Sequence, residues 1–293
     1  MDEEANLGNK RDGILRRNIE GINTMTEKIL VLDIDGTLTT TEKEISPETK
    51  RGLINIQERG HLVMLASGRP TPGMMKYAKE LELEKYGGYL LSFNGARIIN
   101  CATGEIVFQK TLPRHVIPSL YKFAKEHDLG LLTYYGDYIV SGNKMDEYVE
   151  IESRINGIPV RQVGDFVDFV DFDVNKCLMT APPEKAEECV KLLQEKYKDT
   201  LSIYRSEPFF IEIMPKNVDK ATSLDRMLET VGLSRENVIC CGDGYNDITM
   251  IEYAGVGVAM QNARDEVKQA ADYVTEKTND QDGIVEVVEK FVL

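Results

Sequence analysis

The sequence predicts a doubly wound α/β fold, in which helices cover both faces of a mostly parallel sheet. Three observations indicate this fold. Short apolar runs rich in β-branched residues alternate with amphipathic helical segments over most of the chain. Several of these runs end in acids, glycine or serine, which is typical of buried parallel strands. A middle stretch with a different pattern interrupts the alternation, so we expect an inserted second domain.

The first strand–helix–strand unit lies near the start of the regular pattern. Residues 28–33 (KILVLD) and 61–66 (HLVMLA) are the first two expected strands. Between them, residues 46–59 open with Ser-Pro-Glu, the signature of a helix start, and Gly60 follows as a stop. A third strand is expected over 89–93, so the unit begins a parallel sheet with right-handed crossovers.

The same alternation returns in the last third of the chain. The expected helices cover 220–231, 247–254 and 263–271, and the expected strands cover 209–214, 237–241, 255–259 and 273–275. Residues 26–111 and 208–293 are therefore expected to form one domain around a single sheet.

Residues 112–207 are the expected insert, an α+β cap long enough to fold around its own core. Its expected helices cover 116–127 and 183–197, and its expected strands cover 137–141 and 176–180. Residues 165–174 alternate acids with Phe and Val, which fits a half-solvated strand or linker and also a substrate-facing surface.

Residues 1–25 are polar and lack periodicity, so we expect a disordered or non-native extension. They contain no apolar stretch of the secretory type. The codons of Glu20 and Gly21 must be purine-rich, as in a bacterial ribosome-binding site, which raises the hypothesis that translation starts at Met25.

The composition narrows the function. The 293 residues favour two domains, and 35 basic against 49 acidic residues give a net charge of −14, which disfavours nucleic acid as a partner. No apolar run approaches the ~18 residues of a membrane span. Five cysteines without a CxxC pair fit reduced thiols in a cytoplasmic protein. A small phosphorylated ligand is compatible with this net charge, because a local pocket can be positive in an acidic protein.

Two acids directly follow the first expected strand. Residues 33–38 read DIDGTL, and open α/β sheets bind ligands at the carboxyl ends of their strands. Asp33 and Asp35 can reach one centre only if the chain turns between them, which Gly36 permits. An EF-hand calcium loop is excluded, because its sixth position must be glycine and Leu38 stands there. A plain acidic turn is the alternative.

Three further elements carry related chemistry. Ser67-Gly68-Arg69 follows the second strand and offers a hydroxyl and backbone N–H groups to an anion, although Ser-Gly is also an ordinary turn. Residues 242–247 (GDGYND) follow the strand expected at 237–241, and they too fail as an EF-hand loop. Lys220 begins a helix and would by itself be read as a solvated side chain.

Together these elements predict a metal-dependent site for a phosphorylated ligand. Carboxylates are hard oxygen ligands, which suits Mg²⁺. Asp33, Asp35, Asp243 and Asp247 carry −4, whereas Mg²⁺ and Lys220 return only +3. Two carboxylates ~4 Å apart repel by about 4 kcal/mol in an intermediate dielectric, so we expect Asp35 to hold a proton. A protonated acid is also what a leaving oxygen requires.

The motifs DIDGTL, SGR, a distant lysine and GDGYND, in this order, resemble the haloacid dehalogenase superfamily. The insert resembles the large cap of its Cof-type phosphatases, and the resemblance covers about residues 26–293. Three secondary segments match as well, at 94–96 (NGA), 257–263 (GVAMQNA) and 282–283 (DG). The resemblance implies a Rossmann-like core and a cap that sets substrate specificity.

The resemblance also implies stepwise phosphoryl transfer. Asp33 would attack phosphorus to form an aspartyl-phosphate, and Asp35 would protonate the leaving alcohol and later deprotonate water. Mg²⁺ would be bound by the Asp33 carboxylate, the Asp35 backbone carbonyl and Asp243, with Asp247 as a direct or outer partner. The residues expected to contact the phosphoryl group, directly or by holding its loop, are Thr37, Ser67, Gly68, Lys220 and Asn246. Asn246 would hydrogen-bond either the phosphoryl group or Lys220. Asn94 and Arg69 are the expected substrate contacts.

Some residues depart from the family pattern. Ala221 follows the lysine where glycine is usual, and Asn217 and Gln261 also replace glycines. These changes concern substrate geometry rather than the chemistry. The expected partner is a small phosphorylated metabolite, with sugar phosphates the family's commonest theme, and no pattern marks a surface for self-association. A phosphomutase and a non-enzymatic phosphometabolite-binding protein remain the alternative functions.

Overall fold

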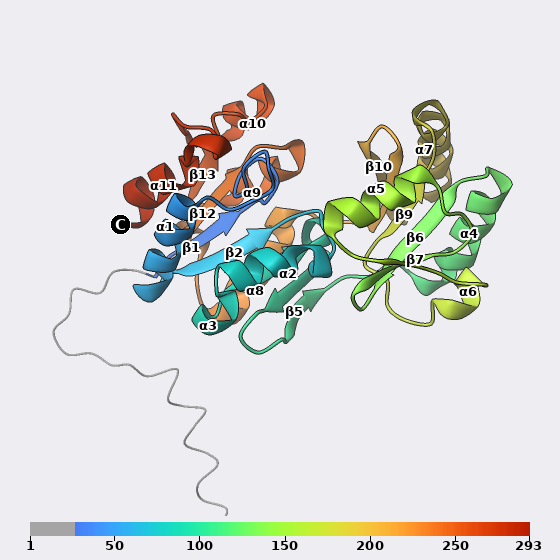
Figure 1. Cartoon of the computed structure of the whole chain (residues 1–293), viewed down its shortest axis with the longest axis horizontal. Helices are drawn as coiled ribbons and strands as arrows, with labels where there is room; N and C mark the ends of the chain where they lie inside the picture. Colours follow the sequence, from blue (N-terminus) through green and yellow to red (C-terminus); the bar gives the residue numbers. More distant parts are fainter. Residues whose placement is uncertain (1–26) are drawn as a thin grey trace, which may run out of the picture.

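The computed structural model describes residues 27–293, so the predictions for residues 1–25 lie outside the described residues. The described residues form two sheets with helices packed against them (Figure 1). We call the eight-stranded sheet and its helices the core unit, and the six-stranded sheet and its helices the insert. Within the described residues, no helix is long and apolar enough to cross a membrane.

The core unit is built on a mostly parallel sheet with the strand order β14-β13-β12-β1-β2-β3-β4-β5. The strands from β14 to β3 are parallel, and β4 and β5 are antiparallel additions at one edge. Their bounds are β1 Ile29–Leu32, β2 Leu62–Ala66, β3 Tyr89–Ser92, β4 Arg97–Asn100, β5 Ile106–Gln109, β12 Val238–Gly242, β13 Val256–Ala259 and β14 Tyr273–Val274. The parallel centre confirms the predicted fold class, whereas the β4–β5 hairpin was not expected.

Helices cover both faces of this sheet (Figure 1). They are α1 Pro47–Glu58, α2 Thr71–Glu80, α3 Leu83–Tyr86, α8 Lys220–Val231, α9 Ile248–Tyr253, α10 Asp265–Ala270 and α11 Gly283–Val287. The start of α1 is as predicted, because the Ser46 side chain accepts a hydrogen bond from the Thr49 N–H. Its end is followed by Gly60, whose φ of 91° suits glycine.

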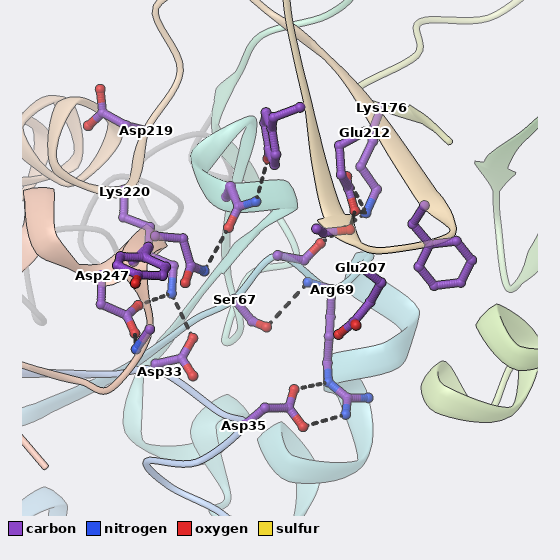
Figure 2. Close-up of a pocket in the computed structure, with 18 of the residues that line it drawn as sticks. Asp33, Asp35, Ser67, Arg69, Lys176, Glu207, Glu212, Asp219, Lys220 and Asp247 are labelled. Carbon is purple, nitrogen blue, oxygen red and sulfur yellow. Dashed lines mark hydrogen bonds and ion pairs between the residues drawn. The ribbon is translucent and has the colours of Figure 1, made fainter. Parts of the chain in front are cut away.

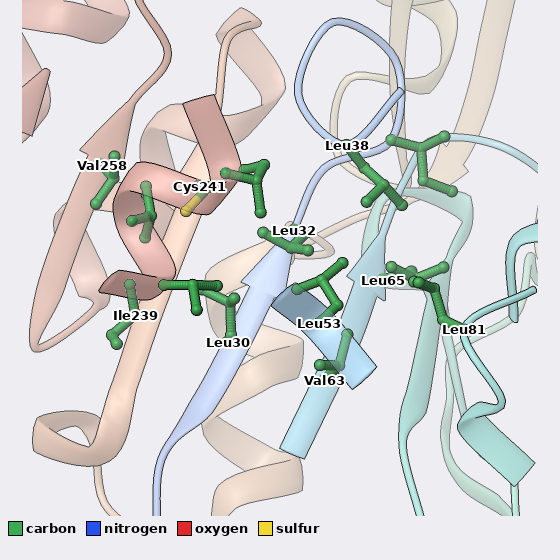
Figure 3. Packing of buried hydrophobic residues seen from close by; sticks show 14 of the residues in the cluster. Leu30, Leu32, Leu38, Leu53, Val63, Leu65, Leu81, Ile239, Cys241 and Val258 are labelled. Carbon is green, nitrogen blue, oxygen red and sulfur yellow. The ribbon is translucent and has the colours of Figure 1, made fainter. Parts of the chain in front are cut away.

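The alternation of side chains along β1 explains why two helical layers are needed. Leu30 and Leu32 point to one face, where they join Leu53 of α1 in a buried cluster (Figure 3). Ile29 and Val31 point to the other face, into a cluster that contains buried residues of α8 and α9. A strand that is apolar at every position is therefore buried on both sides.

The insert follows β5 and precedes α8, and its sheet has the order β10-β11-β9-β6-β7-β8. Its strands are β6 Gly130–Tyr135, β7 Tyr138–Ser141, β8 Val160–Gln162, β9 Cys177–Thr180, β10 Leu201–Glu207 and β11 Phe210–Pro215. Its helices are α4 Ile117–Glu126, α5 Glu147–Asn156, α6 Phe166–Phe169 and α7 Pro183–Tyr197. Buried residues of α4, α7 and the sheet form a hydrophobic cluster separate from those of the core unit.

One expectation about the insert is wrong, and one of the alternatives for residues 165–174 is excluded. The strand expected over 209–214 was placed in the core sheet, but β11 pairs antiparallel with β10 and β9 of the insert. The reason is the short connection between β10 and β11, which fixes a hairpin and moves the junction past residue 208. Residues 165–174 are not a strand. They include the helix α6, whose start is capped by the Asp165 carboxylate.

Leu53 and its neighbour Gly52 give a test of the packing on α1. Leu53 is fully buried, so Leu53→Ala should lower the free energy of unfolding by about 2–5 kcal/mol. A Cβ at Gly52 would meet no atom within 4 Å, so Gly52→Ala should raise it by about 0.4–1 kcal/mol. Urea denaturation followed by far-UV circular dichroism measures both changes. Equal effects of the two substitutions would contradict the described packing.

Candidate active site

A cavity of about 640 Å³ lies between the core unit and the insert, at the carboxyl ends of β1, β2 and β12 (Figure 2). Parallel strands end at the same edge of a sheet, so residues that follow different strands meet there. Asp33 follows β1, Ser67 follows β2, and Asp243 follows β12. The structure thus brings together three of the predicted motifs, and Lys220 at the start of α8 completes the group.

Lys220 is the buried centre of this group. Its Nζ donates hydrogen bonds to Asp33 Oδ1 at 2.7 Å, to Asp247 Oδ1 at 2.5 Å and to the carbonyl oxygen of Ala66 at 2.8 Å. Burial acts to lower the pKa of Lys220, but the charges of Asp247 and Asp33 outweigh it and raise that pKa. The lysine is therefore a cation, and it is not the solvated side chain that its position in the sequence favours.

Asp247 organises the loop that follows β12. Its Oδ2 accepts hydrogen bonds from the backbone N–H groups of Asp243 at 3.0 Å and Gly244 at 2.9 Å, while its Oδ1 accepts from Lys220. Both carboxylate oxygens are thus engaged by the chain itself. Of the two roles expected for Asp247, direct ligand or outer-shell partner of the metal, this arrangement fits the outer-shell partner.

Thr37 and Gly36 join the first motif to the last. The Thr37 hydroxyl donates a hydrogen bond to Asp243 Oδ1 at 2.8 Å. Gly36 has a φ of 85°, and a Cβ there would collide with the Asp243 carboxylate. Thr37 does not line the cavity. It holds the two loops together instead of presenting its hydroxyl to a phosphoryl group.

Three acids of this cluster are suited to hold a cation. Carboxylate oxygens of Asp33, Asp243 and Asp247 lie within 4.8 Å of one another. Burial, and next the charge of Asp247, raise the pKa of Asp33 well above its ordinary value. Burial also raises the pKa of Asp243 to about 6. Such mutual repulsion is relieved by a divalent cation, and an all-oxygen donor set suits Mg²⁺.

Asp35 has a different environment from the other acids. The sequence predicted that Asp35 holds a proton, and this prediction is wrong for the described structure. Arg69 donates to both of its oxygens, from Nε at 2.6 Å and from an Nη at 2.8 Å (Figure 2). Lys43 Nζ donates a hydrogen bond to Oδ1 at 2.8 Å. Burial would raise the pKa of Asp35, but Arg69 and then Lys43 outweigh it and lower the pKa to about 2. The sequence-based charge count omitted these two cations.

Arg69 also reaches the insert. Its other Nη donates a hydrogen bond to the carbonyl oxygen of Ile155, in α5, at 2.7 Å. The guanidinium of Arg69 therefore contacts both the Asp35 carboxylate of the core unit and helix α5 of the insert. The expected contact of Arg69 with substrate is, in this structure, replaced by these two contacts.

The other predicted residues lie around the cavity with contacts of their own. Ser67 and Gly68 line it, and the Ser67 Oγ accepts a hydrogen bond from the Arg69 N–H at 3.2 Å. Asn246 was expected to contact the phosphoryl group or Lys220, but its Nδ2 donates to Asn94 Oδ1 at 3.1 Å. Asn94 also lines the cavity.

The insert contributes buried polar residues to the cavity that the sequence analysis did not identify. Glu152, Lys176 and Glu212 are 6%, 3% and 6% exposed, and all three line the cavity with Asn156. Glu152 Oε1 accepts hydrogen bonds from the Tyr134 hydroxyl at 2.6 Å and from Asn156 Nδ2 at 2.8 Å.

The remaining contacts leave this face rich in acceptors. Lys176 Nζ lies 3.1 Å from Glu212 Oε2 (Figure 2). The buried Asn156 Oδ1 has no hydrogen-bond donor within the described residues. These residues come from α5, from the position just before β9 and from β11, so no short sequence motif could have revealed them.

Comparison with known proteins gives the family. A family model described as haloacid dehalogenase-like hydrolase matches residues 30–288. The putative phosphatase YxeH of Bacillus subtilis is 29% identical over 269 residues, which are 91% of this chain and 98% of YxeH. A putative phosphatase of Haemophilus influenzae is 30% identical over 266 residues, covering 91% of this chain and 98% of that protein.

Solved structures agree with this assignment. The crystal structure of a haloacid dehalogenase-like hydrolase from Bacteroides thetaiotaomicron is 45% identical with a TM-score of 0.87, over 90% of this chain and 98% of that one. The subclass IIB sugar phosphatase BT4131 is 26% identical with a TM-score of 0.75, over 90% and 98% of the two chains. The chain therefore belongs to the haloacid dehalogenase-like hydrolases, within their Cof-type phosphatases.

Proposed function

We propose that this protein hydrolyses the phosphate monoester of a small polyhydroxylated metabolite, in the class of the sugar phosphates, with Mg²⁺ as cofactor and an aspartyl-phosphate intermediate on Asp33. The observation that carries the proposal is the convergence of Asp33, Ser67, Lys220 and Asp243 on one cavity. The phosphatase names of its relatives and the sugar phosphatase with the same fold support it.

Asp33 is the proposed nucleophile. Lys220 binds its Oδ1, and within residues 27–293 no hydrogen bond engages its Oδ2. This supports that oxygen as the one that attacks phosphorus, while the lysine would keep the carboxylate oriented. When bound, Mg²⁺ would neutralise charge on Asp33, Asp243 and the phosphoryl oxygens. Lys220, the Ser67 hydroxyl and nearby backbone N–H groups would orient the phosphoryl group for this attack.

Asp35 is the proposed acid and base. It lies two residues from the nucleophile and lines the same cavity. In this structure Arg69 and Lys43 occupy its oxygens, so one of these contacts has to break before Asp35 can exchange a proton with the leaving oxygen. The displaced guanidinium would then face the cavity, where Arg69 was expected to contact substrate.

The insert supports a polyhydroxylated leaving group. The side chains that it places on the cavity are mainly hydrogen-bond acceptors, with carboxylates at Glu152 and Glu212 and an unpaired amide oxygen at Asn156. Hydroxyl groups are donors that satisfy such acceptors. Two cations of the insert also line the cavity, and both have carboxylate partners: Lys176 lies 3.1 Å from Glu212, and Arg205 lies 3.7 Å from Glu187.

The catalytic proposal is tested by removing the nucleophile. Asp33→Asn should lower kcat for p-nitrophenyl phosphate and for a hexose 6-phosphate by about a thousandfold or more, because the amide cannot form the covalent intermediate. Phosphate release is measured with Mg²⁺ and with EDTA, and EDTA should abolish turnover. Asp225→Asn, a carboxylate on α8 outside the cavity, is the matched control and should keep parental activity. Transfer of phosphate to a second hydroxyl instead of water would indicate a mutase.

The role of the metal is tested by its pH dependence. The pKa of Asp243 is raised from 3.8 to about 6, and that of Asp33 is also raised, so the metal-free fold loses stability as the pH rises through this window. Mg²⁺ competes with protons for these carboxylates, so its stabilisation should grow over the same window. Thermal unfolding should show a larger Mg²⁺-induced rise in Tm at about pH 7.5 than at about pH 5. Asp243→Asn should reduce that difference, and equal shifts at both pH values would contradict the assignment.

The substrate class is tested at Glu152. Glu152→Ala should raise KM for a hexose 6-phosphate by about tenfold or more, because a charge-assisted hydrogen bond to a hydroxyl is lost. The KM for p-nitrophenyl phosphate, which has no sugar hydroxyls, should stay within about twofold. Glu150→Ala, on the exposed face of the same helix, is the matched control. A parallel loss with both substrates would place Glu152 in the fold of the insert rather than in recognition.

A further inference from the structure

A second cavity, of about 210 Å³, lies at the junction of the core unit and the insert. It is lined by Phe93 and Arg97 of the core unit, by Tyr134 and Tyr135 of the insert, and by Asn175 and Lys176. Lys176 lines the catalytic cavity as well, and it is the one residue that the two linings share. The mechanism proposed above makes no use of this second cavity.

Arg97 is the uncompensated charge of this cavity. Its guanidinium takes part in no ion pair and no side-chain hydrogen bond within residues 27–293, and its Nε is buried without a partner. Burial lowers the pKa of Arg97, which agrees with a cation that no carboxylate stabilises. Guanidinium groups offer five donors and are normally paired when they leave water.

The neighbouring polar groups of the cavity are already engaged. Lys176 pairs with Glu212, and Asn175 Nδ2 donates to the carbonyl oxygens of Ala96 at 3.0 Å and Lys110 at 2.9 Å. The Asp173 carboxylate, 61% exposed, pairs with Arg114 at 3.3 Å. Of the charged side chains that line this cavity, Arg97 is therefore the one without a partner within the described residues. Aromatic side chains line the cavity beside it.

We propose that this cavity binds the phosphate or carboxylate group of a small anion on Arg97. The planar fork of a guanidinium matches both groups with paired hydrogen bonds. The aromatic side chains reduce access of water, which strengthens the pairing. Because Arg97 belongs to β4 of the core unit and Tyr135 to β6 of the insert, a bound anion would connect the two units outside the catalytic cavity.

The chain offers a specific reporter, because it contains no tryptophan. Tyr135 lines the second cavity and is 44% exposed, so Tyr135→Trp introduces a single tryptophan at this site, which can be excited selectively over the tyrosines. We would titrate the full-length Tyr135→Trp protein with sulfate, which stands for a phosphate group, and separately with acetate, which stands for a carboxylate. Chloride keeps the ionic strength constant. The expected result is a saturable fluorescence change with at least one of the two anions.

Arg97→Gln in the same background should raise the Kd of that anion by tenfold or more. Arg226→Gln is the matched control, since it removes an exposed guanidinium that lies 5.2 Å from the Phe108 ring, and it should leave the Kd unchanged. Arg97→Lys keeps the charge but loses the fork, and we expect an intermediate Kd. No saturable change with either anion, or an unchanged Kd in both Arg97 variants, would overturn the proposal, because anions in the catalytic cavity do not require Arg97.

Discussion

The buried ammonium group of Lys220 is the interaction on which the rest of the site depends. Four carboxylates gather at the ends of β1 and β12 or beside them, and an unpaired group of acids would not stay buried there. Lys220 bridges two of these acids, Asp33 and Asp247, which belong to segments far apart in the chain. It thereby holds the first and last motifs side by side, next to the proposed cation site.

The two sheets divide the work between them. The core unit supplies charged groups on short loops that follow rigid parallel strands, an arrangement that keeps reacting groups in place. The insert supplies acceptors on α5 and on the β10–β11 hairpin, which stand across the cavity from those loops. The two sets of side chains also meet directly, since Arg69 donates to the carbonyl oxygen of Ile155 and Lys176 to that of Gly68.

Much of the core unit and of its site was predictable from the sequence. Asp33, Ser67 and Asp243 each follow an apolar strand, and parallel topology then brings them to one edge without further information. The protonation of Asp35 was not predictable, because its partners Arg69 and Lys43 reach it only through the folded loops. The polar residues that the insert places on the cavity were missed for a similar reason, since Glu152, Lys176 and Glu212 share no motif and meet only in the tertiary structure.

The double contact of Arg69 has a thermodynamic consequence. The same guanidinium binds the Asp35 carboxylate and the carbonyl oxygen of Ile155, so the seating of α5 and the retention of Asp35 are linked equilibria. A shift of α5 away from the core unit would weaken the Arg69–Asp35 contact. By reciprocity, loss of the Arg69–Asp35 contact would favour the shift of α5 by the same free energy. Access to the cavity and availability of its acid are then one cooperative event, without any need for a separate signal between the two units.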